Sequence, residues 1–301
     1  MKRLLLLLTF MVVGFMLTIN ASAKTIVTDG LVSYWTFDRK TMYDKTVEDV
    51  WGENDATIVG NPTITSGYLI HGLKLDGLGD YVSLPNVGNF GSRIGPYTFE
   101  AWLKTSHKRR WSAIFKVNEA PCEIKNIGYG ILINAWLGRG FENRIETKED
   151  GILLERSPKR ENGCGGSASG RTYPVSDGEW HHIVWTIREA TQEERGDFRD
   201  LPDEADCLKS FLYLDMEPIM SPNSCSSPNA NLPYTGPIFL GAVNNMGKAS
   251  GFFQGVFDEV RIYDRALTEE EVIHNYESGI GLSVEPIQKL STVWGALKTK
   301  H

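Results

Sequence analysis

Two pairs of adjacent side chains in this sequence are of types that carry acid–base or metal chemistry. His181 and His182 are neighbours in one apolar run, and Asp258 and Glu259 are neighbours in another. Both runs have the composition of β-strands, in which successive side chains point to opposite faces of the sheet. Two such imidazoles cannot converge on one ion or substrate atom, so we expect core and cross-strand hydrogen-bonding roles for the histidines. We likewise expect one carboxylate of the Asp258-Glu259 pair on each side of its strand.

Two tryptophans in turn-like surroundings are candidates for ligand contact. Trp111 follows Arg109 and Arg110, and Trp136 lies between Asn134 and Arg139. A sugar ring presents an apolar face and a rim of hydroxyls, so its site combines an exposed aromatic ring with nearby amides and carboxylates. Trp111 and Trp136 are therefore our ligand-binding candidates. The alternative is that each packs under an insertion, because tryptophan is more often a core residue.

These candidate residues lie among short predicted strands that are rich in β-branched and aromatic residues. Turns such as Asp76-Gly77 separate the strands. So many short antiparallel strands must close into a barrel or form two packed sheets, because one open sheet would leave an apolar face in water. The chain is therefore predicted to be all-β. The candidate strands are Leu31–Phe37, Gly72–Leu75, Tyr81–Leu84, Thr98–Lys104, Ser112–Val117, Tyr129–Asn134, His181–Ile187, Phe211–Leu214, Ile238–Leu240 and Val256–Tyr263.

Four tryptophans and two insertions stand out against these strands. Trp35, Trp102, Trp180 and Trp185 fall in or beside candidate strands, where we expect each ring to fill the space between two sheets. The insertion 161–170 is rich in glycine. The insertion 189–206 is rich in acidic residues, which predicts a solvated loop; a cation-attracting lip is the alternative.

One helix is predicted near the end of the chain, at 267–276. Thr268 and Glu271 have the spacing of a capping box, and Gly279 stands where a left-handed C-cap would. The following segment, 284–300, has amphipathic spacing, which predicts a helical tail that frays at the surface or docks on the domain or a partner.

The first 23 residues have the pattern of a secretory signal. Lys2 and Arg3 precede an apolar run, and Ala21-Ser22-Ala23 has the small-x-small form of a cleavage site. We therefore predict a secreted or extracytoplasmic protein with a signal peptide at 1–23, a single domain at 24–278 and a tail at 279–301, without a later membrane span. The net charge of −7 argues against a nucleic-acid partner.

Export also bears on the four cysteines, Cys122, Cys164, Cys207 and Cys225. An even number in an oxidising compartment favours disulfides, whereas no two have the C-x-x-C spacing of a zinc site. Four cysteines allow three connectivities, which the sequence does not distinguish. We favour Cys122 with Cys164 and Cys207 with Cys225, because each pair brackets strands joined by a turn that can bring its ends together.

Several motifs, in this order, resemble the laminin G-like branch of the concanavalin A-like lectin/glucanase superfamily. They are Gly30-Leu-Val-Ser-Tyr-Trp-Thr-Phe-Asp38, Leu73-Lys-Leu-Asp-Gly77 with Asp80-Tyr-Val82, Thr98-Phe-Glu-Ala-Trp102, Trp180-His-His-Ile-Val184 and Gly255-Val-Phe-Asp-Glu-Val-Arg-Ile-Tyr263. The resemblance runs from about residue 28 to 278 and implies a two-sheet jelly-roll sandwich. The insertions and the cysteines lie outside the shared pattern.

The resemblance also implies a structural calcium ion where the first and last strands meet. The positions that match the family's ligands are Asp38, Asn54 and Asp258, with Asp55 as the alternative to Asn54 because the loop is shorter than usual. Calcium takes six to eight oxygen ligands, which carboxylates and carbonyls supply. Without calcium, Asp258 would accept hydrogen bonds from turn amides or pair with Arg261.

Catalysis is not expected from this sequence. The superfamily's glucan hydrolases use a Glu-x-Asp-x-x-Glu pattern, but Ile58 and Lys209 occupy the third position after Glu53-x-Asp55 and Glu204-x-Asp206. Motifs for serine nucleophiles, catalytic zinc and nucleotides are also absent. We therefore expect a non-catalytic module that binds an extracellular glycan. The alternatives are an adhesion or scaffold module for a cell-surface or matrix protein and a glycan-active enzyme without the usual motif.

Overall fold

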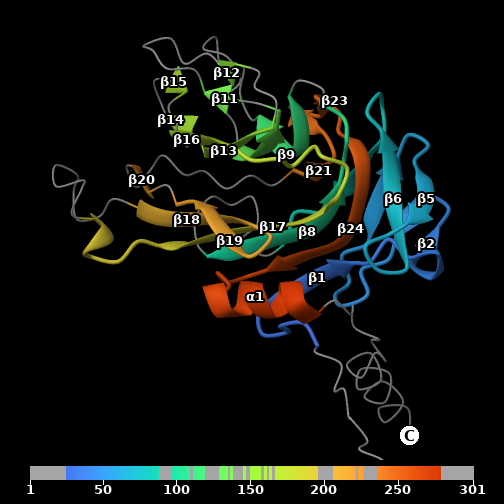
Figure 1. Cartoon of the computed structure of the whole chain (residues 1–301), viewed down its shortest axis with the longest axis horizontal. Helices are drawn as coiled ribbons and strands as arrows, with labels where there is room; N and C mark the ends of the chain where they lie inside the picture. Colours follow the sequence, from blue (N-terminus) through green and yellow to red (C-terminus); the bar gives the residue numbers. More distant parts are fainter. Residues whose placement is uncertain are drawn as a thin grey trace, which may run out of the picture.

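The computed structural model describes residues 25–87, 96–108, 111–118, 129–134, 136–137, 145–146, 150–156, 159–160, 163–164, 167–195, 206–221, 223–226 and 236–278. The predicted signal peptide, the tail 279–301, Gly279 and Cys122 lie outside these residues. The described part of the chain forms two large β-sheets, with one α-helix against the outer side of one of them (Figure 1).

The first sheet has nine strands, of which β8 and β24 are central neighbours. All its pairings are antiparallel. Its strands are β1 (Leu31–Trp35), β5 (Thr63–Ser66), β6 (His71–Asp76), β8 (Tyr97–Lys104), β17 (Trp180–Glu189), β18 (Asp206–Leu214), β19 (Glu217–Met220), β20 (Asn223–Ser226) and β24 (Gln254–Tyr263).

The second sheet has eleven strands and packs across the first. It consists of β2 (Met42–Tyr43), β3 (Thr46–Val47), β4 (Ala56–Val59), β7 (Tyr81–Leu84), β9 (Ser112–Asn118), β10 (Tyr129–Ile133), β13 (Gly151–Arg156), β16 (Ser167–Thr172), β21 (Ile238–Leu240), β22 (Val243–Asn245) and β23 (Lys248–Ser250). Two short hairpins and a 3-10 turn complete the β structure: β11 (Trp136–Leu137) with β12 (Ile145–Glu146), β14 (Lys159–Arg160) with β15 (Gly163–Cys164), and η1 (Arg39–Thr41).

The all-β prediction is confirmed, and each candidate strand overlaps an observed one. Most of the strands that were not predicted have two to four residues, which carry little periodic signal, but the six-residue β13 and β16 were also missed. Part of the glycine-rich insertion forms a strand. Its last residues begin β16, which pairs with β13 along six residues.

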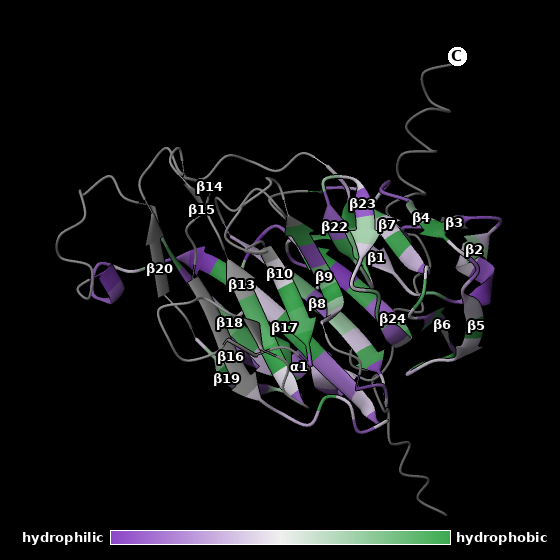
Figure 2. Ribbon diagram, turned by 90° about the horizontal axis from the view of Figure 1, so that it is seen from above, coloured by the Kyte–Doolittle hydropathy of each residue, from purple (hydrophilic) through white to green (hydrophobic). Residues whose placement is uncertain are grey.

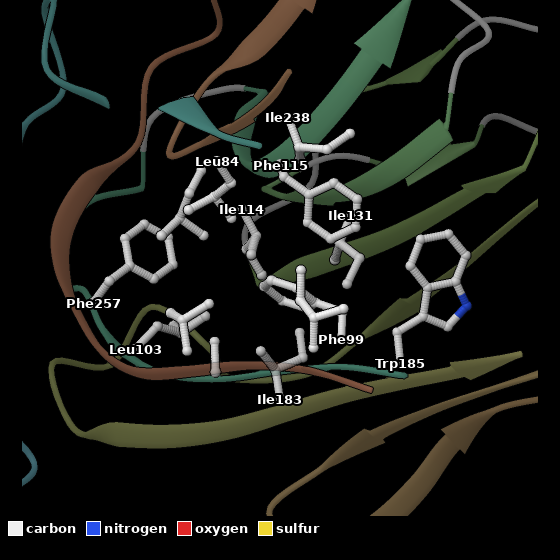
Figure 3. Packing of buried hydrophobic residues seen from close by; sticks show 14 of the residues in the cluster. Leu84, Phe99, Leu103, Ile114, Phe115, Ile131, Ile183, Trp185, Ile238 and Phe257 are labelled. Atoms are coloured by element: carbon white, nitrogen blue, oxygen red, sulfur yellow. The ribbon is translucent and has the colours of Figure 1, made fainter. Parts of the chain in front are cut away.

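The main core lies between the two sheets and draws on both. Phe99, Leu103 and Trp185 of the first sheet face Phe115 and Ile131 of the second (Figure 3). Viewed from above, hydrophobic residues concentrate on central strands such as β9 and β10 (Figure 2). Alternate residues of these strands point into the core, as the two-residue period of a strand requires.

The prediction that four tryptophans fill the space between the sheets is correct for Trp35 and Trp185, which are fully buried in this core. It is wrong for Trp102 and Trp180. These two lie on the opposite, outer face of the first sheet, where Trp102 contacts Tyr276 of the helix. Both faces of β8 are buried, so its sequence does not reveal which residues face the core.

The helix α1 (Glu269–Ser278) covers part of this outer face (Figure 1). Its capping box is formed as predicted: the Glu271 amide donates to the Thr268 hydroxyl at 3.3 Å, and the Thr268 amide donates to the Glu271 carboxylate at 2.9 Å. Leu267 and Val272 pack on Tyr34, Val184 and Tyr263 of the sheet. No helix among the described residues is long and apolar enough to cross a membrane.

Cys207 is disulfide-bonded and stands directly opposite Cys225 in the antiparallel ladder of β18 and β20. This register favours the predicted pairing of Cys207 with Cys225. Only the backbone of Cys164 is described, in β15, so the pairing of Cys122 with Cys164 stays a prediction.

Candidate functional site

A fully buried ion cluster lies on the outer face of the first sheet, beneath α1. Its centre is Glu100 of β8, which accepts hydrogen bonds from His182 Nε2 at 2.7 Å, Arg261 Nη1 at 2.9 Å and Asn275 Nδ2 at 2.9 Å. These four side chains are at most 3% exposed. His182 therefore has the cross-strand role expected from the sequence, and the cluster ties β8, β17, β24 and α1 together.

The electrostatics of this cluster are those of a structural element. Burial opposes ionisation of Glu100, but Arg261 and the hydrogen bonds from His182 and Asn275 outweigh it and lower the Glu100 pKa to about 2. Arg261 also binds Glu259 at 2.6 Å, and the Tyr34 hydroxyl donates to the same carboxylate. Such a cluster holds its charges in place but is closed to a substrate.

The expectation that Asp258 and Glu259 point to opposite sides of their strand is wrong. Asp258 lies opposite Trp102 and Arg261 opposite Glu100, so two residues of β24, Glu259 and Val260, face a single residue of β8. This β-bulge, with Glu259 at φ 52°, interrupts the alternation on which the expectation rests. Burial, then the neighbouring Glu259 carboxylate, raises the Asp258 pKa to about 8.

Asp258 and Asp38 both hold the turn between β5 and β6. The Leu69 amide donates to Asp258 Oδ2 at 3.0 Å, and the His71 amide donates to Asp38 Oδ1 at 3.2 Å. A Cβ atom on Gly67 would lie 2.5 Å from Asp258 Oδ2 and from the His71 carbonyl oxygen, so only glycine fits there. Two of the predicted metal ligands are thus brought together at this turn.

Asn54, the third predicted ligand, belongs to a different cluster. Its amide nitrogen donates to the Ser33 hydroxyl at 2.9 Å, and its backbone amide donates to Asp49 at 3.2 Å. The fully buried Asp49 also accepts from the Tyr34 and Gly52 amides, so it organises the loop. Across the described residues, no three His, Cys, Asp or Glu side chains are grouped to hold a metal. Near the turn, two carboxylates and backbone carbonyls form a donor set that suits calcium but is incomplete.

An aromatic patch adjoins this turn; we define it as Tyr68, Trp102, Trp180 and Tyr276. Tyr68 stacks on Trp102 with ring centroids 3.4 Å apart and meets Trp180 edge-on at 6.1 Å. Tyr276 stacks against Trp102 at 5.3 Å. Trp102 is buried, whereas the other three rings are half-exposed.

Several elements far apart in the sequence build this patch. Trp102 of β8 lies opposite His182 of β17, and Trp180 stands two residues before His182, which puts both tryptophans on the outer face. The second half of α1 contributes Tyr276, and the Asp258-held turn contributes Tyr68. Sequence reasoning missed both tyrosines because neither lies in a periodic pattern.

The phenol groups of Tyr68 and Tyr276 both have raised pKa values. Within the described residues, neither Tyr68 Oη nor Tyr276 Oη forms a hydrogen bond with another side chain or the backbone. Burial is the main cause that raises the pKa of Tyr68, followed by Tyr276 and Asp215; burial and Asp215 raise the pKa of Tyr276. Both phenols therefore stay protonated at neutral pH and can donate hydrogen bonds.

His181 follows the patch residue Trp180 in β17 and lies between two carboxylates. Its Nδ1 lies 2.7 Å from Asp215 Oδ2 and its Nε2 lies 3.0 Å from Asp177 Oδ1. The hydrogen bond to Asp215 raises the His181 pKa against the effect of burial, and Asp177 adds to the increase. His181 and His182 thus serve separate clusters, as their adjacency predicts.

The predicted ligand candidates Trp111 and Trp136 are not part of the patch. Trp111 directly precedes β9, where it is half-buried and has a φ of 62°. Because Ser112 pairs with Ile133, Trp111 lies near Asn134, which follows β10. There, Asn134 Nδ2 donates to the His107 carbonyl at 3.1 Å, and the Ser176 hydroxyl donates to Asn134. Trp136 opens β11, but its side chain lies outside the described residues.

Comparison with known proteins supports the fold. A laminin G-like family profile, described as the concanavalin A-like lectin/glucanases superfamily, matches residues 211–273. No curated protein sequence matches the chain.

Solved structures with the same fold come from several sources. The binding domain of Paraclostridial Mosquitocidal Protein 1 is 15% identical, with a TM-score of 0.52, over 83% of this chain and 52% of that one. A Trypanosoma rangeli sialidase mutant with trans-sialidase activity is 15% identical, with a TM-score of 0.54, over 86% of this chain and 35% of that one. The binding domain of botulinum neurotoxin DC, solved with rat synaptotagmin II, is 11% identical, with a TM-score of 0.52, over 84% of this chain and 52% of that one.

This chain therefore spans about half the length of two of these proteins and about a third of the other. At such low identities the likeness concerns the fold alone. Together with the profile match, it confirms the resemblance that the sequence motifs indicated. The chain has the two-sheet jelly roll and, over residues 211–273, the sequence pattern of the concanavalin A-like lectin/glucanases superfamily.

Proposed function

We propose that this protein is a secreted, non-catalytic module that binds an extracellular glycan through the aromatic patch. The observation that carries the proposal is the grouping of three half-exposed rings, Tyr68, Trp180 and Tyr276, around the buried Trp102. A sugar ring stacks its apolar face on such rings, while its hydroxyls need hydrogen-bond partners at the edge. The two phenols and the Asp215 carboxylate supply those partners.

The carboxylates near the patch favour binding over hydrolysis. A retaining glycosidase needs two carboxylates about 5 Å apart on either side of a bound sugar, one free to attack and one to donate a proton. Glu100 and Glu259 are buried and bound by Arg261, and Asp258 is occupied by turn amides. Asp215 is held by His181 and the His182 amide.

The test is a glycan-array screen of the purified protein, followed by affinity measurements on variants. We expect Tyr276→Ala and Tyr68→Ala to weaken binding about tenfold, the equivalent of about 1.4 kcal/mol. Tyr43→Ala is the matched control, because Tyr43 is an exposed tyrosine outside the patch. Equal affinities for all three variants would place binding elsewhere, with Trp111 and Trp136 the next positions to test.

A second candidate function is adhesion to a cell-surface or matrix protein. The botulinum neurotoxin DC binding domain, which shares the fold, was solved with rat synaptotagmin II. In this chain the acidic insertion 189–206 or the tail 279–301 would offer the contact. Absence of glycan binding together with capture of a defined protein that is lost on removing the tail would favour this function.

We further propose that a structural calcium ion binds at the turn between β5 and β6. Asp38 and Asp258 would supply carboxylate oxygens, and carbonyls of the turn would supply others. The Asp258 carboxyl group is fully buried and forms no ion pair among the described residues, so its ionisation costs desolvation energy that a bound cation would relieve. Asn54 would have to break its hydrogen bond to the Ser33 hydroxyl to become a ligand of this ion.

The calcium proposal is tested by thermal unfolding with added calcium and after chelation. We expect calcium to raise the Tm of the wild-type protein and not that of Asp258→Asn. Asp76→Asn, at an exposed turn, is the control and should keep the calcium effect. An unchanged Tm of the wild-type protein would exclude the site.

Secretion is the remaining part of the proposal. It rests on the sequence of residues 1–23. N-terminal sequencing of protein recovered from the medium or an extracytoplasmic compartment should begin at residue 24, and an intact N-terminus on cytoplasmic protein would contradict it.

A further inference from the structure

His181 is in contact with a carboxylate at each of its two ring nitrogens. Nδ1 lies 2.7 Å from Asp215 and Nε2 lies 3.0 Å from Asp177, and the imidazole is nearly buried. A carboxylate is only a hydrogen-bond acceptor, and neutral histidine has only one N–H. Both contacts can be hydrogen bonds only if both nitrogens carry protons. The geometry therefore requires an imidazolium.

The two carboxylates belong to different turns. Asp177 opens the turn that precedes β17, where its carboxylate also accepts from the Glu179 amide at 2.8 Å. Asp215 lies in the turn between β18 and β19. Among the described residues, His181 is the side chain that binds both of these turns, so the imidazolium acts as a bridge between them.

The Asp215 turn needs such support. Asp215 and Met216 both have positive φ values, 49° and 74°, a conformation that costs free energy in residues other than glycine. The Asp215 amide donates to the His182 carbonyl at 2.9 Å, and the His182 amide donates to Asp215 Oδ1 at 2.8 Å. The His181 contact fixes the second carboxylate oxygen.

Asp215 in turn acts on the aromatic patch. The His182 amide donates to Asp215 Oδ1 at 2.8 Å, and the ring centroid of the same His182 lies 4.9 Å from that of Trp102 and 5.7 Å from that of Tyr276 in the patch. After burial, the Asp215 charge also contributes to the raised pKa of Tyr68 and of Tyr276. We propose that His181 is a positioning residue whose imidazolium bridges the Asp177 and Asp215 turns, an arrangement that we call the clasp. Through this bridge, ligand binding at the aromatic patch is coupled to proton uptake. This inference rests on the proposed function, because the ligand it acts on is the glycan of that site.

The charged groups around His181 leave few other sources of pH dependence. Within the described residues, Asp215 and Asp177 act on His181 directly, and β8 presents the apolar Leu103 opposite it. The 105–108 segment is joined to the Asp177 turn by a hydrogen bond from the Gly178 amide to the Thr105 carbonyl. This segment carries His107 and Lys108, and Lys108 Nζ lies 3.9 Å from Asp150 Oδ2.

The expected direction follows from these contacts. Two carboxylates stabilise the protonated form, so the clasp is complete below the ordinary histidine pKa of about 6.5 and opens as pH rises through the higher pKa in the folded protein. When His181 loses one proton, one of the two aspartates faces the lone pair of a ring nitrogen instead of an N–H group. Affinity at the aromatic patch should therefore fall on the alkaline side by about fivefold, in the range typical of coupled sites.

The experiment has one part that needs no ligand. Histidine ring signals of the whole protein are followed by NMR between pH 5 and 9. The Asp215 amide serves as a reporter of the clasp, and the Trp180 indole serves as a reporter of the aromatic patch. We expect both His181 nitrogens to be protonated at pH 6, with a midpoint above about 6.5 that the two reporters share. Asp177→Asn, which leaves Asp215 in place, should lower that midpoint.

The second part measures glycan affinity over the same pH range. We expect His181→Gln to remove the pH dependence, and His274→Gln, at an exposed contact with the Thr25 carbonyl, to retain it. A His181 midpoint at or below about 6.5, or reporters that titrate independently of it, would overturn the clasp. A His181 midpoint above about 6.5 that both reporters share, together with no glycan binding at any pH, would instead refute the proposed function alone. Glycan affinity that is the same at pH 6 and pH 9 would refute the coupling while leaving the glycan site intact.

Discussion

Glu100 is the residue on which the outer face of the first sheet depends. It is fully buried and accepts from His182, Arg261 and Asn275, which belong to three different elements. A buried charge cluster of this kind costs desolvation energy, but removing one member leaves the others uncompensated. Glu100 therefore matters more for fixing the arrangement than for net stability.

We predict that Glu100→Gln lowers the free energy of unfolding by about 3–5 kcal/mol, because Arg261 and His182 lose their shared counter-charge. Denaturant unfolding monitored by tryptophan fluorescence measures the effect. Glu217→Gln, an exposed glutamate in β19, is the matched control and should change stability by about 0.5 kcal/mol or less. Equal effects of the two substitutions would contradict the role assigned to the cluster.

The pH dependence of stability follows from the same carboxylate. The Glu100 pKa is lowered to about 2, so its stabilising contribution is complete above the ordinary value of 4.5 and is lost as pH falls towards 2. We predict that the difference in stability between wild type and Glu100→Gln shrinks over this window. Unfolding curves at a series of pH values test this, and a constant difference would argue against an ionised Glu100.

At the scale of elements, α1 is held by its first turn as well as by the ion cluster. Thr268 and Glu271 exchange hydrogen bonds, and Arg265 binds the Glu271 carboxylate at 2.7 Å through two nitrogens. Burial of Val272 and Asn275 then seats the helix on the sheet.

Thr268→Ala is predicted to cost about 1 kcal/mol, the usual effect of removing an N-cap side chain. Thermal unfolding measures the loss, and Thr268→Ser, which keeps the hydroxyl, should restore most of it. Because α1 carries Tyr276, fraying of this helix should also weaken binding at the aromatic patch. A Thr268→Ala protein with wild-type stability would show that the ion cluster alone holds the helix.

The disulfide at the end of the first sheet is another element-scale constraint. Cys207 and Cys225 face each other in the β18–β20 ladder. We predict that non-reducing peptide mapping links these two residues and that the Cys207→Ala/Cys225→Ala protein loses about 3 kcal/mol, as expected for a loop of this size. A peptide linking Cys207 to Cys122 or Cys164 would refute the pairing.

At the scale of the whole molecule, one core serves both sheets. Phe115 of the second sheet contacts Phe99 and Trp185 of the first, with ring centroids 4.7 Å and 5.9 Å apart. A shared core makes the sheets depend on each other, so they should unfold together.

We therefore predict a single unfolding transition that coincides by fluorescence and circular dichroism. Phe115→Ala should lower stability by about 3–5 kcal/mol without separating the two signals. Leu78→Ala, at a side chain that is 73% exposed, is the control and should have little effect. Two separate transitions in the wild-type protein would show that the sheets fold independently.

Features that arise from neighbouring residues could be predicted from the sequence. Short runs of β-branched and aromatic residues bounded by turns indicated strands such as β7 and β21 with their observed bounds, and the spacing of Thr268 and Glu271 indicated the start of α1. The separate roles of His181 and His182 also followed, because adjacent side chains of a regular strand point to opposite faces. These inferences need no knowledge of distant contacts.

The face that each element presents, and the residues that meet on that face, depend on tertiary packing and could not be predicted from the sequence. Trp102 lies in a strand buried on both faces, so no pattern could assign it to the outer side. The bulge at Glu259 placed both carboxylates on one side, and its position depends on pairing with β8. The aromatic patch joins residues from Tyr68 to Tyr276, and the chain positions that meet in such a patch are set by long-range strand pairing, which local sequence does not encode.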